Sequence, residues 1–213
     1  MRVSVQVKIC GITNAPDARA AAAAGADAIG LVFFPGSKRA VTTDQAAAIC
    51  EALPPLVTVT ALFVNAEARE VEAVLKSVPV NLLQWHGAET PEFCEQWDLP
   101  YIRAVTAEAA NRLENVMADY PKARGFLIDA VADGQFGGTG HTFDWSIIPS
   151  PCSRPIILAG GLNPANVGDA VTRVRPAAVD VSTGVERGPG IKDPDKIREF
   201  IRAARDAAEV STL

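Results

Sequence analysis

Histidine is scarce in this sequence, and its cysteines show no metal-binding spacing. The 213 residues include two histidines and four cysteines, and no two cysteines form a Cys-x-x-Cys pair. No cysteine has a histidine at the spacing of a zinc site. These absences argue against a bound metal. We expect four reduced thiols, at Cys10, Cys50, Cys94 and Cys152.

Other signatures are missing as well. No apolar run reaches the roughly 18 residues of a membrane helix, and the N-terminus lacks a signal-peptide pattern. The formal net charge is -5 with acids and bases interspersed, which argues against a nucleic-acid partner. No Gly-x-Gly-x-x-Gly follows the first expected strand, and no Walker ending is present, so a dinucleotide or P-loop site is not expected. We predict a cytoplasmic protein without a membrane or nucleic-acid partner.

What the sequence does contain is a regular alternation of strand and helix signals. Short runs rich in Val, Ile and Leu, typical of parallel strands buried on both faces, alternate with segments that begin at capping residues. We expect strands at 3–10, 27–34, 56–64, 80–87, 101–106, 125–130, 155–161 and 178–184. We expect helices at 14–26, 42–53, 65–78, 90–97, 107–120, 144–148, 163–174 and 193–210. The expected caps are Asn14, Thr42 or Thr43, Asn65, Thr90, Asn163 and Asp193.

Eight strand–helix units in one chain predict a single-domain (β/α)8 TIM barrel with a parallel eight-stranded core over residues 1–213. An open doubly wound sheet is the competing architecture. In a barrel, the active site lies at the C-terminal ends of the strands and in the loops that follow them. Polar and reactive residues stand at those positions: Cys10, Arg39, Asn65, Gln84, His86, Arg103, Asp129, Gly160, Gly161, Asp180, Ser182 and Gly184.

Two glycine-containing loops predict a phosphate site. "LAGGLNP" follows the seventh expected strand and "VDVSTGVE" contains the end of the eighth. Barrels often bind a phosphate between these loops, through backbone N–H groups and the N-terminus of a short extra helix. The alternative is that the glycines only form tight turns. A third loop, residues 133–145, is rich in glycine and is expected to act as a lid. The candidate phosphate-binding residues are Gly160, Gly161, Ser182, Thr183 and Gly184.

Cys10 and Asp129 are the candidate catalytic residues. They end the first and sixth expected strands, so they could face each other across a bound substrate. A thiolate and a carboxylic acid can remove and deliver protons at different atoms. An ordinary cysteine pKa of about 8.5 is within reach of a base in an electropositive site. Asp129 would need protection from water to keep a proton. The alternatives are that Cys10 is a small buried hydrophobe and that Asp129 is a cap or turn residue.

Four further residues are candidate substrate contacts. The planar fork of Arg39 suits a substrate carboxylate, with a solvated surface charge as the alternative. Gln84 and His86 end the fourth expected strand, where a lone histidine is more often structural than catalytic. Asp180 faces either the mouth of the barrel or a substrate hydroxyl.

Seven motifs, in order from about residue 7 to residue 200, together resemble phosphoribosylanthranilate isomerase. They are "KICGIT", "GLVFFPGSKRAV", "LFVN", "LQWHG", "GGTGHTFDW", "ILAGGLNPANV" and "VDVSTGVE...PGIKD". The resemblance implies an Amadori rearrangement in tryptophan biosynthesis. In it, N-(5-phosphoribosyl)anthranilate becomes 1-(o-carboxyphenylamino)-1-deoxyribulose 5-phosphate.

The resemblance also implies roles for individual residues. The cysteine of "KICG", Cys10, would be the general base, and Asp129 the general acid. Arg39 would lie near the anthranilate carboxylate, and Asp180 would contact the substrate. No cofactor is implied, the partner is a small phosphosugar substrate, and we expect a monomer or a homodimer. The phosphate loops would include Gly161, Ser182 and Gly184.

Three rival interpretations remain at this stage. Indoleglycerol phosphate synthase needs a catalytic lysine at a strand end, and Lys8 is the only lysine within an expected strand. A metal-dependent sugar-phosphate epimerase needs histidine and aspartate ligands on several strands. A non-catalytic phosphate-sensing barrel would keep the phosphate loops but would not need Cys10 or Asp129.

Overall fold

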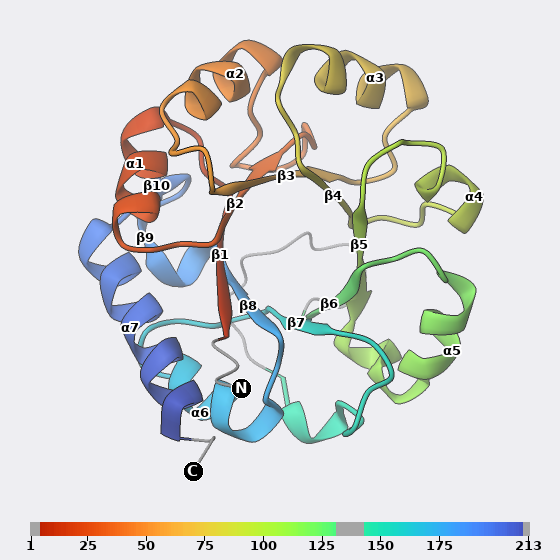
Figure 1. Cartoon of the computed structure of the whole chain (residues 1–213), viewed down its shortest axis with the longest axis vertical. Coiled ribbons are helices and arrows are strands. Elements are labelled where there is room, and N and C mark those ends of the chain that lie inside the picture. The colour runs from red at the N-terminus through yellow and green to blue at the C-terminus, as the bar shows by residue number, and fades with distance from the viewer. Residues whose placement is uncertain (1–4, 131–142, 211–213) are drawn as a thin grey trace.

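The computed structural model describes residues 5–130 and 143–210, in which eight parallel strands close into a barrel (Figure 1). The strands pair in chain order, and β8 closes the ring on β1. The predicted (β/α)8 barrel is confirmed, and the open doubly wound sheet is excluded. The strands are β1 Gln6–Cys10, β2 Ala28–Val32, β3 Thr58–Phe63, β4 Leu82–Trp85, β5 Tyr101–Thr106, β6 Gly125–Asp129, β7 Ile156–Leu158 and β8 Ala178–Val181.

Helices surround the ring of strands (Figure 1). They are α1 Ala15–Ala23, α2 Thr43–Glu51, α3 Ala68–Ser77, α4 Pro91–Cys94, α5 Leu113–Asp119, α6 Val167–Val174 and α7 Pro194–Val210. The described residues also form three 3-10 helices and a β-hairpin. The 3-10 helices are η1 Ala107–Arg112, η2 Trp145–Ile147 and η3 Thr183–Val185, and the hairpin consists of β9 Glu186–Gly188 and β10 Ile191–Lys192. The hairpin lies beside α1 and α7. No helix in the described part of the chain is long and apolar enough to cross a membrane.

Four predicted helix caps are confirmed. The side chains of Asn14, Thr42 and Thr90 each accept a hydrogen bond from the amide of the third residue of their helix. The Asp193 carboxylate accepts from the amides of Asp195 and Lys196 at 3.0 and 3.3 Å. Each side chain satisfies a backbone donor that the first helical turn leaves unpaired.

Two predicted caps are wrong. Asn65 adopts a left-handed conformation with φ of 50°, and its Oδ1 accepts from the Ala88 amide at 2.6 Å, so it ties two loops together instead. Helix α3 begins after Glu67, whose amide donates to the Glu70 carboxylate at 2.8 Å. Asn163 forms a short turn, with its Oδ1 accepting from Ala165 N at 2.9 Å, and α6 begins only after Asn166.

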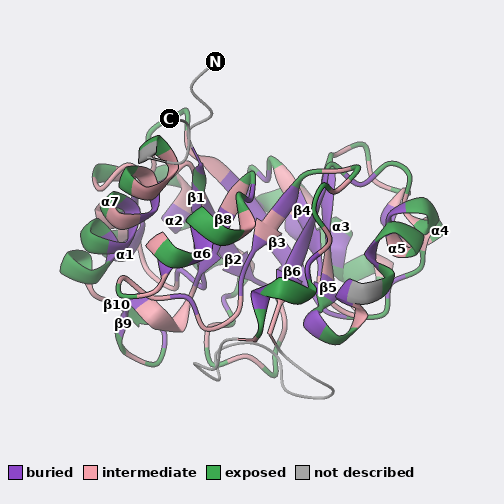
Figure 2. Cartoon of the chain, turned by 90° about the horizontal axis from the view of Figure 1, so that it is seen from below, coloured by how far each residue is buried: buried purple, intermediate pink, exposed green. Residues whose placement is uncertain are grey.

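The two faces of each strand meet different surroundings. Val7 and Ile9 of β1 belong to the large core between the barrel and its helices. Because side chains alternate along a strand, Lys8 and Cys10 point to the inside of the ring. Figure 2 shows the strands as the buried centre and the outer helices as the exposed part. The inside is packed by two small apolar clusters, Cys10, Val32, Leu62 and Val64 on one side, and Ile102, Leu127 and Ala159 on the other.

Candidate active site

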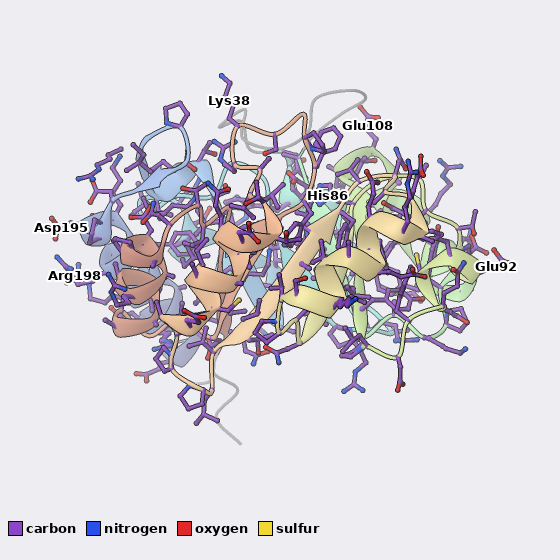
Figure 3. The ribbon with its side chains drawn as sticks, turned by 90° about the horizontal axis from the view of Figure 1, so that it is seen from above. Lys38, His86, Glu92, Glu108, Asp195 and Arg198 are labelled. Carbon is purple, nitrogen blue, oxygen red and sulfur yellow. The ribbon has the colours of Figure 1, made fainter. Side chains whose placement is uncertain are left out.

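A cavity of about 720 Å³, counting the space at its open mouth, lies at the C-terminal ends of the strands. Figure 3 shows His86 toward the end of the barrel where Lys38 lies, whereas Asp195 and Arg198 lie at the edge of the molecule. The structure brings nearly all predicted site residues together around this cavity. Those that line it are Cys10, Arg39, Gln84, His86, Asp129, Gly160, Gly161, Asp180, Ser182 and Thr183.

The Cys10 thiol sits at the end of β1, in a space that the neighbouring strand leaves open. Gly30 of β2 pairs with Cys10, and a Cβ at Gly30 would lie 2.6 Å from the Cys10 Sγ. Glycine is therefore needed here for the close approach of the thiol. Burial raises the pKa of Cys10 above its usual value, and the nearby Lys8 ammonium acts in the opposite direction.

Lys8 and Asp180 form a buried ion pair under the cavity. The Lys8 Nζ donates to Asp180 Oδ1 at 2.9 Å, and the side chains are 6% and 9% exposed. Burial alone would lower the pKa of Lys8, but Asp180 and Cys10 outweigh it and raise the pKa, so Lys8 is protonated at neutral pH. The sequence analysis missed this pair. The signal was the spacing of Lys8 and Cys10, which places both on one face of a strand.

Gln84, His86 and Asp129 form a chain of contacts across the barrel. The Gln84 Nε2 lies 2.9 Å from His86 Nδ1, and His86 Nε2 lies 3.6 Å from Asp129 Oδ2. Burial, together with the cations Lys8 and Arg103, lowers the pKa of His86 to about 4. The imidazole is therefore neutral at pH 7 and is not an ion-pair partner of Asp129. Because the Gln84 amide donates to Nδ1, the ring proton is on Nε2 and faces the carboxylate.

Arg39 belongs to a buried triad of charges. Its Nε and Nη2 both donate to the Glu186 carboxylate at 2.8 Å, and Lys192 Nζ donates to the same carboxylate at 2.8 Å. Lys192 also contacts the Ser182 carbonyl at 3.1 Å. Although burial alone would raise the pKa of Glu186, Arg39 and Lys192 lower it, so the carboxylate is ionised. The sequence analysis missed Glu186 and Lys192, which stand on the two strands of the hairpin.

The loops after β7 and β8 pack closely against their neighbours. Gly160 and Gly161 have φ of 80° and 67°, in the left-handed region that glycine adopts without strain. Ser182 and Thr183 line the cavity, and Thr183 begins η3, the short extra helix that the loop pattern predicted. Gly184 does not line the cavity. A Cβ at Gly184 would collide with the Leu162 carbonyl, so this glycine allows the two loops to meet.

Two expected features are not part of the described site. Arg103 does not line the cavity but donates to the carbonyls of Trp85 and Gly87 at 2.9 and 2.6 Å, which holds the loop after β4. Residues 133–142 of the expected lid, including His141, lie outside the described residues. In the part of the chain that is described, no group of three or more metal-binding side chains gathers.

Fold and cavity define a (β/α)8-barrel enzyme whose site is at the C-terminal face. The family model described as N-(5'phosphoribosyl)anthranilate (PRA) isomerase matches residues 7–203. The chain belongs to this family. The predicted family and the expectation of an isomerase of tryptophan biosynthesis are thereby confirmed, and the synthase and epimerase interpretations are set aside.

Relatives and solved structures agree with this assignment. N-(5'-phosphoribosyl)anthranilate isomerase of Pseudomonas fluorescens (strain Pf0-1) is 55% identical over 202 residues, which cover 95% of this chain and 99% of that protein. The crystal structure of phosphoribosyl anthranilate isomerase from Thermotoga maritima has a TM-score of 0.86 at 42% identity, covering 95% and 99% of the two chains. Another crystal structure contains the isomerase in complex with reduced 1-(o-carboxyphenylamino)-1-deoxyribulose 5-phosphate. Its TM-score is 0.79 at 38% identity, with 95% and 99% covered.

Proposed function

We propose that this chain rearranges N-(5-phosphoribosyl)anthranilate to 1-(o-carboxyphenylamino)-1-deoxyribulose 5-phosphate, with Cys10 as general base and Asp129 as general acid. The observation that carries the proposal is that a thiol from β1 and a carboxyl from β6 line one cavity, next to the loops after β7 and β8. Acid and base from separate strands can act on different atoms of one substrate.

The reaction then proceeds in three steps without a net change in atoms or electrons. Asp129 delivers a proton to the furanose ring oxygen, the bond from that oxygen to C1 breaks, and a protonated Schiff base forms. Cys10 removes the proton from C2, and the electron pair of that bond neutralises the imine nitrogen. The resulting enolamine tautomerises to the ketone. No step requires a metal or a redox cofactor, and the absence of a cofactor stays a prediction.

His86 supports the acid in this scheme. Its Nε2–H faces Asp129 Oδ2 at 3.6 Å, and Gln84 fixes the ring from the other side. A neutral imidazole beside the carboxyl group does not hold it as a permanently ionised partner. A protonated His86 would instead favour the carboxylate and weaken the acid.

Further polar groups suit the ends of the substrate. Glu186 occupies one edge of the Arg39 guanidinium, which leaves Nη1 for the substrate carboxylate. The buried Gln84 Oε1 has no hydrogen-bond partner in the described part of the chain, and a substrate hydroxyl would supply one. Asp180, whose Oδ1 accepts from Lys8, also lines the cavity. The phosphate would bind between the loops after β7 and β8, at Gly160, Gly161, Ser182 and Thr183, with Gly184 closing the loops.

A fluorescence assay tests the proposal. Phosphoribosylanthranilate is generated in place, excess EDTA is present throughout, and loss of the anthranilate-type emission is followed. We expect rapid loss with the wild type and at least a hundredfold slower loss with Cys10→Ala or Asp129→Asn, in line with the usual contribution of a general acid or base. Cys50→Ala is the matched control, because Cys50 is a half-buried thiol outside the cavity and should leave turnover unchanged.

Each result separates the proposal from its rivals. Near-normal turnover by Cys10→Ala would remove the assignment of the base. Binding of substrate without turnover by the folded wild type would favour the phosphate-sensing barrel. A wild type that is active without EDTA but inactive in excess EDTA would contradict a metal-free reaction. The cytoplasmic location and the choice between monomer and homodimer stay predictions from the sequence.

A further inference from the structure

We infer that Lys8 is a positioning residue for the proposed base: its ammonium, held by Asp180 on the adjacent strand, lies beneath the Cys10 sulfur and stabilises the thiolate. The inference rests on the proposed function, because it gives Lys8 a role through Cys10. Lys8 is not among the residues that line the cavity, so it acts without touching substrate.

Strand geometry fixes this arrangement. Lys8 and Cys10 are two residues apart on β1, so both point into the barrel with Lys8 one layer deeper. The register of β1 and β8 places Lys8 opposite Asp180, and the pair meets at 2.9 Å. An ammonium has three donors, and only one is needed for Asp180 Oδ1. The charge of the Lys8 ammonium also favours the Cys10 thiolate.

Several other charged groups face the thiol, and their effects differ. From the adjacent strand, Asp180 disfavours the thiolate, and from the hairpin the buried Lys192 favours it. Lys192 and Arg39 share the single carboxylate of Glu186, so this triad keeps one net positive charge. Lys8 favours the thiolate more strongly than Lys192 does, and it lies on the same face of β1 as Cys10.

Across the cavity, His86 and Asp129 are the other titratable groups that line it. Lys8 also lowers the pKa of His86, because a second positive charge close to the first is unfavourable. One buried ammonium therefore has two effects on the site. It makes the thiolate easier to form on one side and keeps the imidazole neutral on the other, which are the protonation states that the proposed base and acid need.

The test is the pH dependence of Cys10 alkylation by iodoacetamide, measured by mass spectrometry of the peptide that contains Cys10. This readout needs no substrate. We expect Lys8→Met to raise the pH at which Cys10 alkylation is half-maximal, the alkylation midpoint, by at least one pH unit. The thiolate fraction at neutral pH then falls about tenfold, while the higher intrinsic nucleophilicity recovers part of the rate, so alkylation slows about threefold.

Activity supplies a second readout. In Lys8→Met the acidic limb of the kcat/KM profile, which reports the base of the free enzyme, should move to higher pH by the same amount. At neutral pH we expect the factor by which kcat falls to be larger than the factor by which KM rises. Lys122→Met is the matched control. It removes a positive charge from the surface, where Lys122 pairs with Glu95, and should leave both profiles unchanged.

A second variant controls for the effect of Lys8→Met on folding. Lys8→Met leaves Asp180 buried without its partner, which can unfold a barrel. The double variant Lys8→Met/Asp180→Asn removes both charges and keeps the shape of the pair, and its alkylation midpoint should also be raised. The inference would be overturned if either folded variant had an alkylation midpoint within about 0.3 pH unit of the wild-type midpoint. A shift of about 0.3 unit corresponds to roughly a twofold change in the thiolate fraction. Failure of the proposed function looks different: Cys10→Ala would then turn over substrate, whatever the alkylation midpoint of Lys8→Met.

Discussion

Replacing Gly30 with alanine adds a single methyl group next to the proposed base. The added Cβ would lie 2.6 Å from Cys10 Sγ and 3.1 and 3.2 Å from the Cys10 Cα and Cβ. Favourable contacts between such atoms are at about 3.5 to 4.0 Å, so the thiol must move by about 1 Å. Gly30 and Cys10 are paired across β1 and β2, and the backbone can relieve little of this overlap.

The size of the effect follows from this displacement. Overpacking of a core costs about 1–3 kcal/mol, and the smaller conformational entropy of an unfolded chain with alanine returns about 0.4–1 kcal/mol. We therefore expect Gly30→Ala to lower the free energy of unfolding by about 1–2 kcal/mol. A misplacement of about 1 Å at a reacting group costs about a hundredfold in rate, so kcat should fall by about that factor. Urea unfolding and the fluorescence assay measure the two quantities.

Two controls make the reasoning refutable. Gly188→Ala adds a methyl group where no heavy atom lies within 4 Å, so it should leave turnover unchanged and raise the free energy of unfolding by only about 0.4–1 kcal/mol. In a Cys10→Ala background the Sγ is gone, so Gly30→Ala should cost at least about 0.5 kcal/mol less than in the wild type. If Gly30→Ala unfolds at the wild-type urea concentration and keeps its turnover, the close packing of Gly30 against the thiol is not what places the base.

Two further predictions concern stability. The pKa of His86 is about 4 in the folded chain and near 6.5 when unfolded, so the unfolded state binds more protons between these values and stability should fall as pH drops from 6.5 to 4. The free energy of unfolding should fall by about 3 kcal/mol over this pH range. Urea titrations across the range should show that His86→Gln removes most of this loss. An unchanged pH dependence in that variant would contradict a neutral, buried imidazole. Glu186→Gln leaves Arg39 and Lys192 buried without their shared anion and should lower the free energy of unfolding by about 3 kcal/mol. Glu67→Gln, which breaks the exposed pair with Arg69, should change it by less than about 0.5 kcal/mol, and equal effects of the two variants would refute the argument.

The strand order and most of the cavity were predictable because they follow from local signals. Eight apolar runs with caps between them allow few topologies, and a barrel fixes which strand ends share one face. That rule alone places Cys10 and Asp129 around one cavity, although they are far apart in the sequence. Helix boundaries were less predictable. At Asn65 a contact with the following loop decided the conformation, and no neighbour in the sequence indicates that contact.

The charged partners could not be predicted, because they depend on register and on distant segments. Lys8 meets Asp180 only through the pairing of β1 with β8, and Glu186 meets Arg39 only because the hairpin folds back on the loop after β2. Arg103 shows the opposite case. It is the third residue of β5, and the alternation of the strand turns it away from the cavity toward the carbonyls of Trp85 and Gly87.

The seam between β1 and β8 has a consequence for the order in which the chain is made. The Lys8–Asp180 contact spans 172 residues, and the Lys192 amide reaches back 175 residues to Asp17. Because β1 is synthesised well before β8, the Lys8 ammonium has no counter-ion from Asp180 until the last barrel strand has been made. The site cannot exist in a growing fragment. Because the pair joins β1 to β8, opening of that single seam would separate Lys8 from Asp180 while most of the remaining strand pairs are still intact.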